Sequence, residues 1–164
     1  MLQEDCKAPL AKVGEEVGLS PPTIVERIRK LENEGFIRGY HARLDARRLG
    51  LDVTAFIGVV VGHPSNVPGF EHDVTLLPEV LECHHVTGSH TLLVKVKTHN
   101  TETLERLIRC LRSIEGVERT ETSVVLSTLV ERSELDLAPN PVDADVDHEN
   151  RAKSRAKSEP RLCP

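Results

Sequence analysis

The sequence predicts an α+β fold, in which an N-terminal winged helix-turn-helix precedes a larger domain of βαββαβ order. Two patterns carry this prediction. Apolar residues recur at helical spacing twice before residue 35, and from residue 53 onward β-branched runs alternate with helical stripes. A chain of 164 residues has room for two small domains of this kind.

The first 45 residues contain the predicted helical pair. The first helix carries an apolar stripe from Leu10 to Val17 and ends at Gly18. The second begins after Ser20, which is a suitable N-cap, with two prolines in its first turn. Its buried side is predicted to be aliphatic, with Ile24, Val25, Ile28 and Leu31. Residues 36–44 then alternate like a strand, so they predict the hairpin, or wing, that completes the motif.

A predicted linker, residues 46–52, leads to the second domain, residues 53–132. The predicted elements are strand 53–61, helix 67–77, strands 80–86 and 91–97, a helix from about residue 100 to residue 115, and strand 117–130. This order implies an antiparallel sheet with both helices on one face, which is the ferredoxin-like arrangement.

The other face of that sheet is predicted to be apolar as well. The first strand is apolar on both sides, and Leu93 and Val125 fall on the parity opposite to the core. A bare apolar face on so small a domain is expected to meet a partner, most simply a second copy of the chain.

Charge is divided unevenly along the chain, whose formal net charge is −5. Residues 20–48 hold seven Lys/Arg and four Asp/Glu, whereas residues 51–136 hold seven and thirteen. A local basic excess on an acidic body is typical of a small nucleic-acid face. With only four aromatic residues, base-stacking platforms for single strands are disfavoured.

Compartment and termini follow from simpler patterns. The four cysteines form no CxxC pair, and neither a signal peptide nor an apolar run of about 18 residues is recognisable. A cytoplasmic protein without a membrane partner is therefore expected. Residues 133–164 have a composition typical of a disordered tail. Their basic run, 151–157, is interpreted as solvated, with phosphate contact as the alternative.

Three stretches together resemble one family. They are VGLSPPTIVERIRKLENEGFIRGY at residues 17–40, ECHHVTG at 82–88 and GVERTETSVV at 116–125. They are similar to the helix-turn-helix and the effector-binding domain of the leucine-responsive regulatory protein (Lrp/AsnC) family, in the same order, and the likeness covers about residues 2–132. The resemblance implies a bacterial or archaeal transcription regulator of amino-acid-related genes. It also implies a homodimer formed through the sheet, further assembly into octamers, and an amino acid bound between dimers.

The chain departs from the family pattern in two places. The family has a further helix ahead of the first one here, and this chain begins at Met1, near where that helix would end. Either the start is misplaced or the DNA-reading domain has a truncated first helix and lacks a packing element. Many members carry an acidic residue at the position of Thr91, which can receive the ammonium group of an effector. Thr91 offers no such charge, so an effector bound in another way is expected.

Double-stranded DNA is the partner predicted for the second helix. Its N-terminal part would enter the major groove, where Thr and Glu side chains read base edges and Arg reaches guanine or phosphate. The predicted DNA-binding residues are Ser20, Pro22, Thr23, Glu26, Arg27, Lys30, Arg38 and Arg43, the last two through phosphate contacts. The alternative for these side chains is an ordinary solvated face.

An effector site is implied by the resemblance at the turn between the two middle strands. Gly88 permits a tight turn there, and nearby hydroxyls and N–H groups would hold a carboxylate. The residues assigned to the site are Thr87, Gly88, Ser89, His90, Thr91, Leu92, Thr101 and Ser123. The alternative is a β-hairpin with a solvated tip.

Metal binding and catalysis are the remaining alternatives. Cys83 and His85 share a strand face and His90 follows across the turn, but no fourth zinc ligand accompanies them, so no metal is predicted. No Ser/His/Asp spacing, phosphate loop or carboxylate pair is recognisable, so neither catalytic residues nor a cofactor are predicted. The rival to a regulator is a stand-alone small-molecule-binding or oligomerisation module whose truncated DNA-binding domain is inert.

Overall fold

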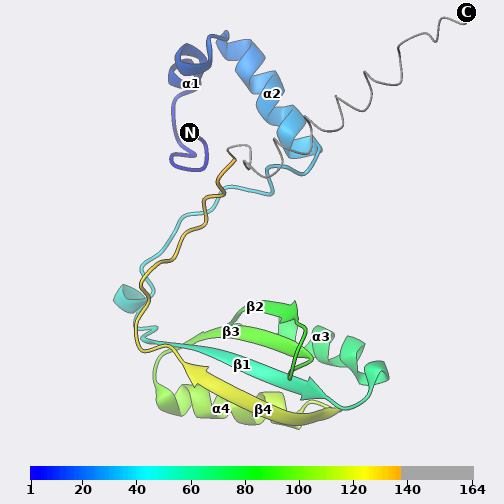
Figure 1. Cartoon of the computed structure of the whole chain (residues 1–164). Helices are drawn as coiled ribbons and strands as arrows, with labels where there is room; N and C mark the ends of the chain where they lie inside the picture. The colour runs from blue at the N-terminus through cyan, green and yellow to red at the C-terminus, as the bar shows by residue number, and fades with distance from the viewer. Residues whose placement is uncertain (138–164) are drawn as a thin grey trace, which may run out of the picture. The chain divides into compact units, whose positions relative to one another are not determined.

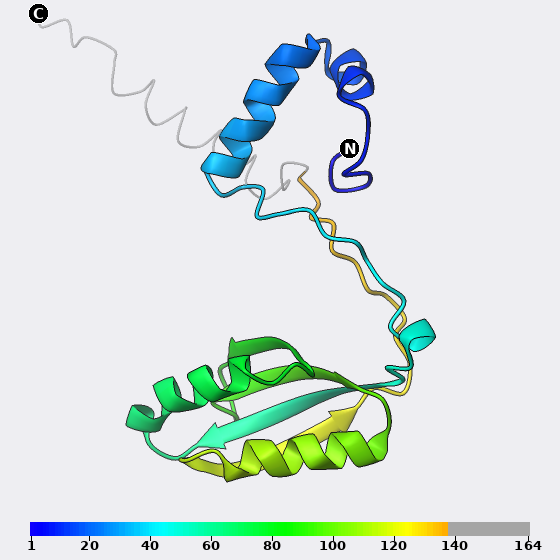
Figure 2. The ribbon, with the colours of Figure 1, turned by 180° about the vertical axis from the view of Figure 1, so that it is seen from behind.

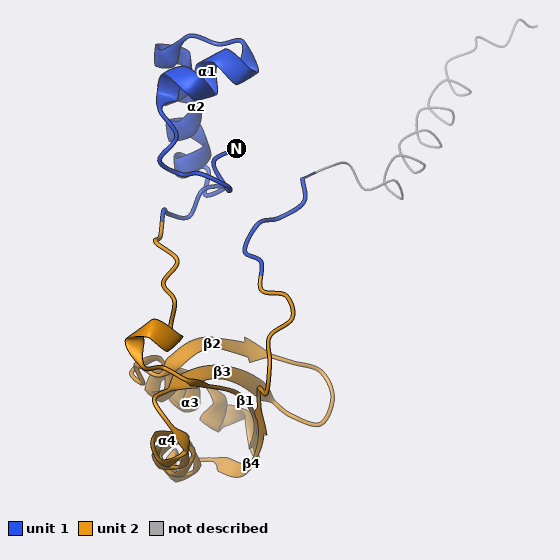
Figure 3. Ribbon diagram, turned by 90° about the vertical axis from the view of Figure 1, so that its left-hand side faces the viewer, with its two compact units in different colours: residues 1–40, 132–164 blue, residues 41–131 orange. Residues whose placement is uncertain are grey.

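The computed structural model describes residues 1–137 and divides the chain into two compact units (Figure 3). Unit 1 comprises residues 1–40 together with the chain from residue 132, and unit 2 comprises residues 41–131. Most of the predicted tail, including its basic run at 151–157, lies outside the described residues.

Unit 1 is built around two helices, α1 (Leu10–Val17) and α2 (Pro21–Asn33). Gly18 adopts the left-handed conformation, with φ 67°, and its N–H donates to the Gly14 carbonyl oxygen. The turn that follows is tight, because a Cβ on Gly14 would lie 2.5 Å from the Leu19 carbonyl oxygen. Val13 and Ile24 are the buried apolar residues between the helices. The predicted helix, turn and helix are confirmed.

The predicted wing is wrong. Residues 36–44 form no strand, and all four strands in the described part of the chain belong to a single sheet in unit 2. A strand requires a partner for its N–H and C=O groups, and this segment finds none. Its alternating apolar residues are consequently uncovered in the chain itself: Phe36 is 75% exposed and Leu44 is 71% exposed.

Unit 2 contains the βαββαβ domain. Its elements are β1 (Val53–Val61), α3 (Val67–Thr75), β2 (Val80–His85), β3 (Leu92–Thr98), α4 (Thr101–Ser113) and β4 (Val117–Val124), with one-turn 3₁₀ helices at Arg47–Leu49 and Pro64–Asn66. The strand order is β2-β3-β1-β4, and each neighbouring pair is antiparallel (Figure 1). The predicted α+β, ferredoxin-like arrangement is confirmed.

Both helices cover the same face of the sheet, as Figure 2 shows from behind. Alternate residues of the two central strands meet apolar residues of α3 and α4 there. The buried core comprises Ala55, Ile57, Val59 and Val61 of β1, Leu92, Val94 and Val96 of β3, Phe70 and Val74 of α3, and Leu104, Leu107 and Leu111 of α4. We call the opposite face the open face of the sheet.

The last strand is shorter than predicted. The apolar run suggested a strand over 117–130, but β4 ends at Val124. Its partner is β1, and β1 begins at Val53, so pairing stops once the Val125 N–H has donated to the Thr54 carbonyl oxygen at 2.9 Å. Beyond that point no neighbouring strand remains, and Leu126 and Leu129 are each 93% exposed.

Candidate functional site: an exposed helix face and a folded-back turn

The exposed face of α2 carries most of the residues assigned to DNA. Pro22, Glu26, Arg27 and Lys30 are exposed, whereas Ile24 of the same helix is buried. Thr23 is half-buried, and its hydroxyl lies 2.8 Å from that of Ser20. The helix therefore presents a rigid polar surface that is anchored by an aliphatic one.

Neighbouring carboxylates modify this surface. Lys30 Nζ lies 3.8 Å from Glu34 Oε1, a distance at which an exposed pair is weakly coupled. The Tyr40 hydroxyl donates to Glu32 Oε1 at 3.0 Å. Partial desolvation and this carboxylate raise the pKa of Tyr40, so its phenol stays neutral.

The two arginines assigned to phosphate contacts differ. Arg38 is exposed. Arg43 Nη2 instead donates to the Glu131 carbonyl oxygen at 2.8 Å and lies 3.4 Å from the Glu131 carboxylate. Arg43 is thus paired within unit 2, whereas Arg38 is available to an anion.

The effector turn, residues 86–91, connects β2 to β3. Thr87, Gly88 and Ser89 are exposed, and Gly88 has φ 109°, a conformation that L residues rarely adopt. The Thr91 N–H donates to the Val59 carbonyl oxygen at 2.8 Å, and Thr91 Oγ1 accepts from the Val61 N–H at 3.1 Å. The Thr91 hydroxyl therefore already serves the backbone of β1, which the sequence did not indicate.

The remaining residues assigned to the effector lie elsewhere in the chain. Thr101 begins α4, beyond the end of β3 that is remote from Leu92. At roughly 3.3 Å per residue, a seven-residue strand separates these ends by about 20 Å. Ser123 lies near the end of the edge strand β4, where it pairs with Phe56 of β1. One chain does not bring Thr101 to the turn, so a site that includes both requires more than one subunit.

The histidines and the cysteine near the turn do not converge on a metal. Cys83 and His85 lie opposite core residues of β3, and His85 Nε2 lies 2.5 Å from Glu71 Oε1 of α3. His84 points to the open face, 3.3 Å from Glu82. No group of three or more potential ligands that could hold a metal ion occurs within residues 1–137. Burial, with Glu71 nearby, raises the pKa of the Cys83 thiol, which keeps it protonated.

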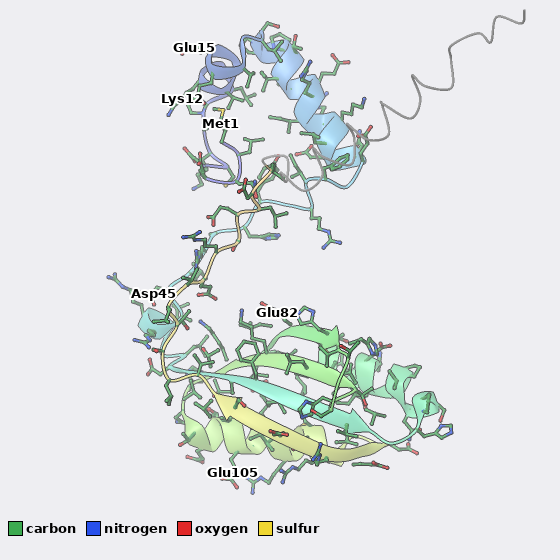
Figure 4. The ribbon with its side chains drawn as sticks, viewed as in Figure 1. Met1, Lys12, Glu15, Asp45, Glu82 and Glu105 are labelled. Atoms are coloured by element: carbon green, nitrogen blue, oxygen red, sulfur yellow. The ribbon has the colours of Figure 1, made fainter. Side chains whose placement is uncertain are left out.

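A charge network that the sequence did not suggest crosses the open face. Lys95 Nζ lies 2.8 Å from Glu82 Oε1 and 3.8 Å from Glu131 Oε1 (Glu82 is labelled in Figure 4). The hydrogen bonds from Lys95 and His84 lower the pKa of Glu82. The sequence alone could not have indicated this network, because the pairing of Glu82 with Lys95 depends on the register between β2 and β3.

No helix among the described residues is both long and apolar enough to cross a membrane.

Comparison with known proteins assigns both parts of the chain. Residues 1–32 match the AsnC-type helix-turn-helix domain, and residues 54–135 match the Lrp/AsnC ligand binding domain. The chain belongs to the Lrp/AsnC family. The resemblance seen in the sequence is confirmed.

Individual relatives of this Lrp/AsnC protein are transcription regulators. The HTH-type transcriptional regulator FL11 of Pyrococcus horikoshii is 40% identical over 137 residues, which cover 82% of this chain and 89% of that protein. Regulatory protein AsnC of Escherichia coli K12 is 29% identical, over 80% of this chain and 88% of its own. This chain is accordingly a DNA-binding transcription regulator of the same family.

Solved structures show the same architecture. E. coli AsnC superposes with a TM-score of 0.76 at 28% identity, covering 81% of this chain and 90% of that one. A transcriptional regulator of Neisseria meningitidis in complex with L-Met gives a TM-score of 0.79 at 29% identity, covering 84% and 90%.

Proposed function

We propose that this Lrp/AsnC regulator reads duplex DNA with the exposed face of α2 and that an amino acid bound at the effector turn controls it. The two functions follow the predicted domains: residues 1–45 recognise DNA, and residues 53–132 bind the effector and associate with other copies of the chain. The protein acts in the cytoplasm, where bacterial and archaeal chromosomes lie, and performs no catalysis of its own.

The α2 surface is the observation that carries the proposal. Arg27 and Lys30 are exposed whereas Ile24 is buried, so they can reach DNA without disturbing the packing of the helix. Glu26, Thr23 and Pro22 lie on the same N-terminal part, the part that enters the major groove in helix-turn-helix proteins. Ser20 directly precedes the first turn of the helix, and Arg38 adds a phosphate contact.

Arg43 takes a different part in this proposal. Its guanidinium is held by Glu131, so a phosphate contact would require that pair to open. We assign the remaining DNA affinity to Arg27, Arg38 and Lys30, of which Lys30 has only its weak, exposed pair with Glu34 to exchange.

The effector is an amino acid whose site is shared between subunits. Two solved relatives hold L-Met, the Neisseria regulator and a feast or famine regulatory protein of M. tuberculosis. In this chain Thr101 lies too far from Thr87–Leu92 for both to enclose one small molecule, so subunits of a homodimer, or of an octamer built from dimers, supply these residues and Ser123 jointly.

DNA binding is tested by selecting genomic fragments bound to the purified full chain and titrating the recovered duplex by mobility shift. Arg27→Ala should weaken binding at least tenfold at fixed salt, since a side chain that contacts guanine is worth about 1–3 kcal/mol. The matched control is Arg109→Ala, on α4 of unit 2, where the side chain is 66% exposed beside Glu105. Equal affinity of both variants would remove α2 from the mechanism.

Effector binding is tested by isothermal titration of the same protein with each of the twenty amino acids. At least one should bind, and Ser89→Ala should weaken it without changing DNA affinity in the absence of the amino acid. If none of the twenty amino acids binds, the turn has a structural role only and an amino-acid effector is refuted.

A further inference from the structure

Gly58 is a buried residue on the face of the sheet that no helix covers. It lies in the middle of β1, and its neighbours Ile57 and Val59 point into the core on the other face. What buries Gly58 is the imidazole of His90. A Cβ on Gly58 would lie 2.5 Å from His90 Cδ2 and 2.6 Å from Nε2, closer than any side chain tolerates.

His90 reaches Gly58 because the effector turn folds back over the sheet. The turn crosses in front of β1 in Figure 1, and Figure 3 shows it on the side away from α3 and α4. Thr91 fixes the base of the turn through its two hydrogen bonds to β1 at Val59 and Val61. His90 Nε2, 3.2 Å from Glu121 Oε2 of β4, fixes its tip.

The other histidines of this region provide a comparison. His84 and His85 each pair with a glutamate, yet both side chains are 58% exposed. The His90 side chain is only 21% exposed, although its partner Glu121 is more exposed, at 64%, than the glutamate partners of the other two. The contact with Gly58 explains why His90 is less exposed than His84 and His85. Its ring packs on the Cα of Gly58, which shields the imidazole from water, whereas an ion pair at the protein surface leaves the ring solvated.

The geometry points to His90 as a latch between the effector turn and the open face. Its ring, seated on Gly58 and bonded to Glu121, makes the turn part of the surface that receives a second copy of the chain. This inference rests on the proposed function, in which the turn holds the effector and the open face forms the homodimer. His90 is a positioning residue: it acts through the conformation of the turn.

A regulatory consequence follows. An effector that rearranges residues 87–89 must either keep the ring on Gly58 or lift it and uncover the β1 backbone. Ligand affinity and self-association are then coupled, and the coupling is reciprocal: what the effector does to assembly, assembly does to effector affinity. Without His90 the turn is no longer held on Gly58, and self-association should stop responding to the effector.

The seat of the latch is tested in the full chain with Gly58→Ala, His90→Ala and the double variant. Hydrogen exchange of the peptide covering residues 86–92 and thermal unfolding are measured for each. Gly58→Ala alone should speed exchange of the turn at least tenfold, because its Cβ expels the ring. In the His90→Ala background the same substitution should change exchange less than twofold, since the space is then free. His84→Ala is the matched control and should leave the turn unchanged.

An effect of Gly58→Ala that is the same with and without His90 would overturn the latch. Phe is the informative replacement for the ring: His90→Phe keeps the packing but loses the bond to Glu121, so it should protect the turn better than His90→Ala. Both measurements are made on one chain and need neither DNA nor effector. They therefore test the contact between His90 and Gly58 even if the proposed function is wrong.

Coupling is tested by sedimentation of the wild type and His90→Ala with and without 5 mM L-methionine, on the order of a saturating concentration for a millimolar site. The wild-type association constant should change at least fivefold with the amino acid, and the His90→Ala constant less than twofold. An equal response of the two proteins refutes the coupling. If the wild type does not respond to L-methionine, the experiment is repeated with the amino acid that binds in the calorimetric titration. If none of the twenty amino acids binds, both the regulatory consequence and the amino-acid effector are refuted.

Discussion

Unit 1 and unit 2 differ in how much of their apolar surface they bury by themselves. In unit 2, twelve apolar residues form one core beneath the sheet. In unit 1, only Val13 and Ile24 are buried among the described apolar residues, whereas Val17 is half exposed and Phe36 three-quarters exposed. Burial of apolar surface is the main favourable term in folding. Unit 2 therefore buries an extensive apolar core of its own, and unit 1 buries far less among the described residues.

The largest expected effect breaks unit 2. Leu111→Ala should lower its free energy of unfolding by about 3 kcal/mol, because a fully buried leucine leaves a cavity in a packed core. Urea unfolding with exchange mass spectrometry assigns the loss to residues 41–131. Leu126→Ala, at an exposed leucine of the same unit, should change stability by less than about 0.5 kcal/mol.

A smaller effect is expected in unit 1. Ile24→Ala should cost about 2 kcal/mol locally, since Ile24 provides much of the small contact between α1 and α2. DNA affinity should fall with it, while unfolding of unit 2 stays unchanged. Val17→Ala, at a half-exposed position of α1, is the control. If Ile24→Ala also lowered the stability of residues 41–131, the two units would not be independent.

The helix starts of the two units sharpen the comparison. In α4 the Asn100 side chain accepts the Thr103 N–H at 2.9 Å and forms a capping box, so Asn100→Ala should cost about 1 kcal/mol. Ser20 makes no side-chain cap bond at α2, so Ser20→Ala should cost less than half as much. Thermal unfolding of both variants gives the ratio, and a larger loss for Ser20→Ala would contradict this account.

The smallest expected effect is a pH dependence in unit 2. Lys95 and His84 lower the pKa of Glu82 in the folded state, so Glu82 stabilises the fold above its ordinary pKa of about 4.5. This contribution is lost as pH falls through the lowered pKa. Glu82→Gln should lower the free energy of unfolding by less than about 1 kcal/mol at pH 7, as expected for an exposed ion pair. It should also reduce the loss of stability below the ordinary pKa of Glu82. A titration of Lys95→Met by NMR should show the Glu82 pKa moving upward.

Local patterns in the sequence were sufficient wherever one periodicity described one buried face. β1 was predicted over residues 53–61 and has those bounds, because a β-branched run covered on both sides leaves a continuous signal. The apolar stripe on α4 is equally local, and so are the two helices of unit 1. The resemblance to the Lrp/AsnC family added the function, which no single residue carries.

Tertiary structure decided what depends on partners distant in the chain. Residues 36–44 alternate like a strand but have nothing to pair with, and β4 ends where β1 begins, since a strand exists only as long as its neighbour does. The same holds for the site: the turn and its residues are readable in the sequence, but the His90 ring on Gly58 is not. That contact joins positions 32 residues apart through the register of three strands, and only the folded sheet fixes that register.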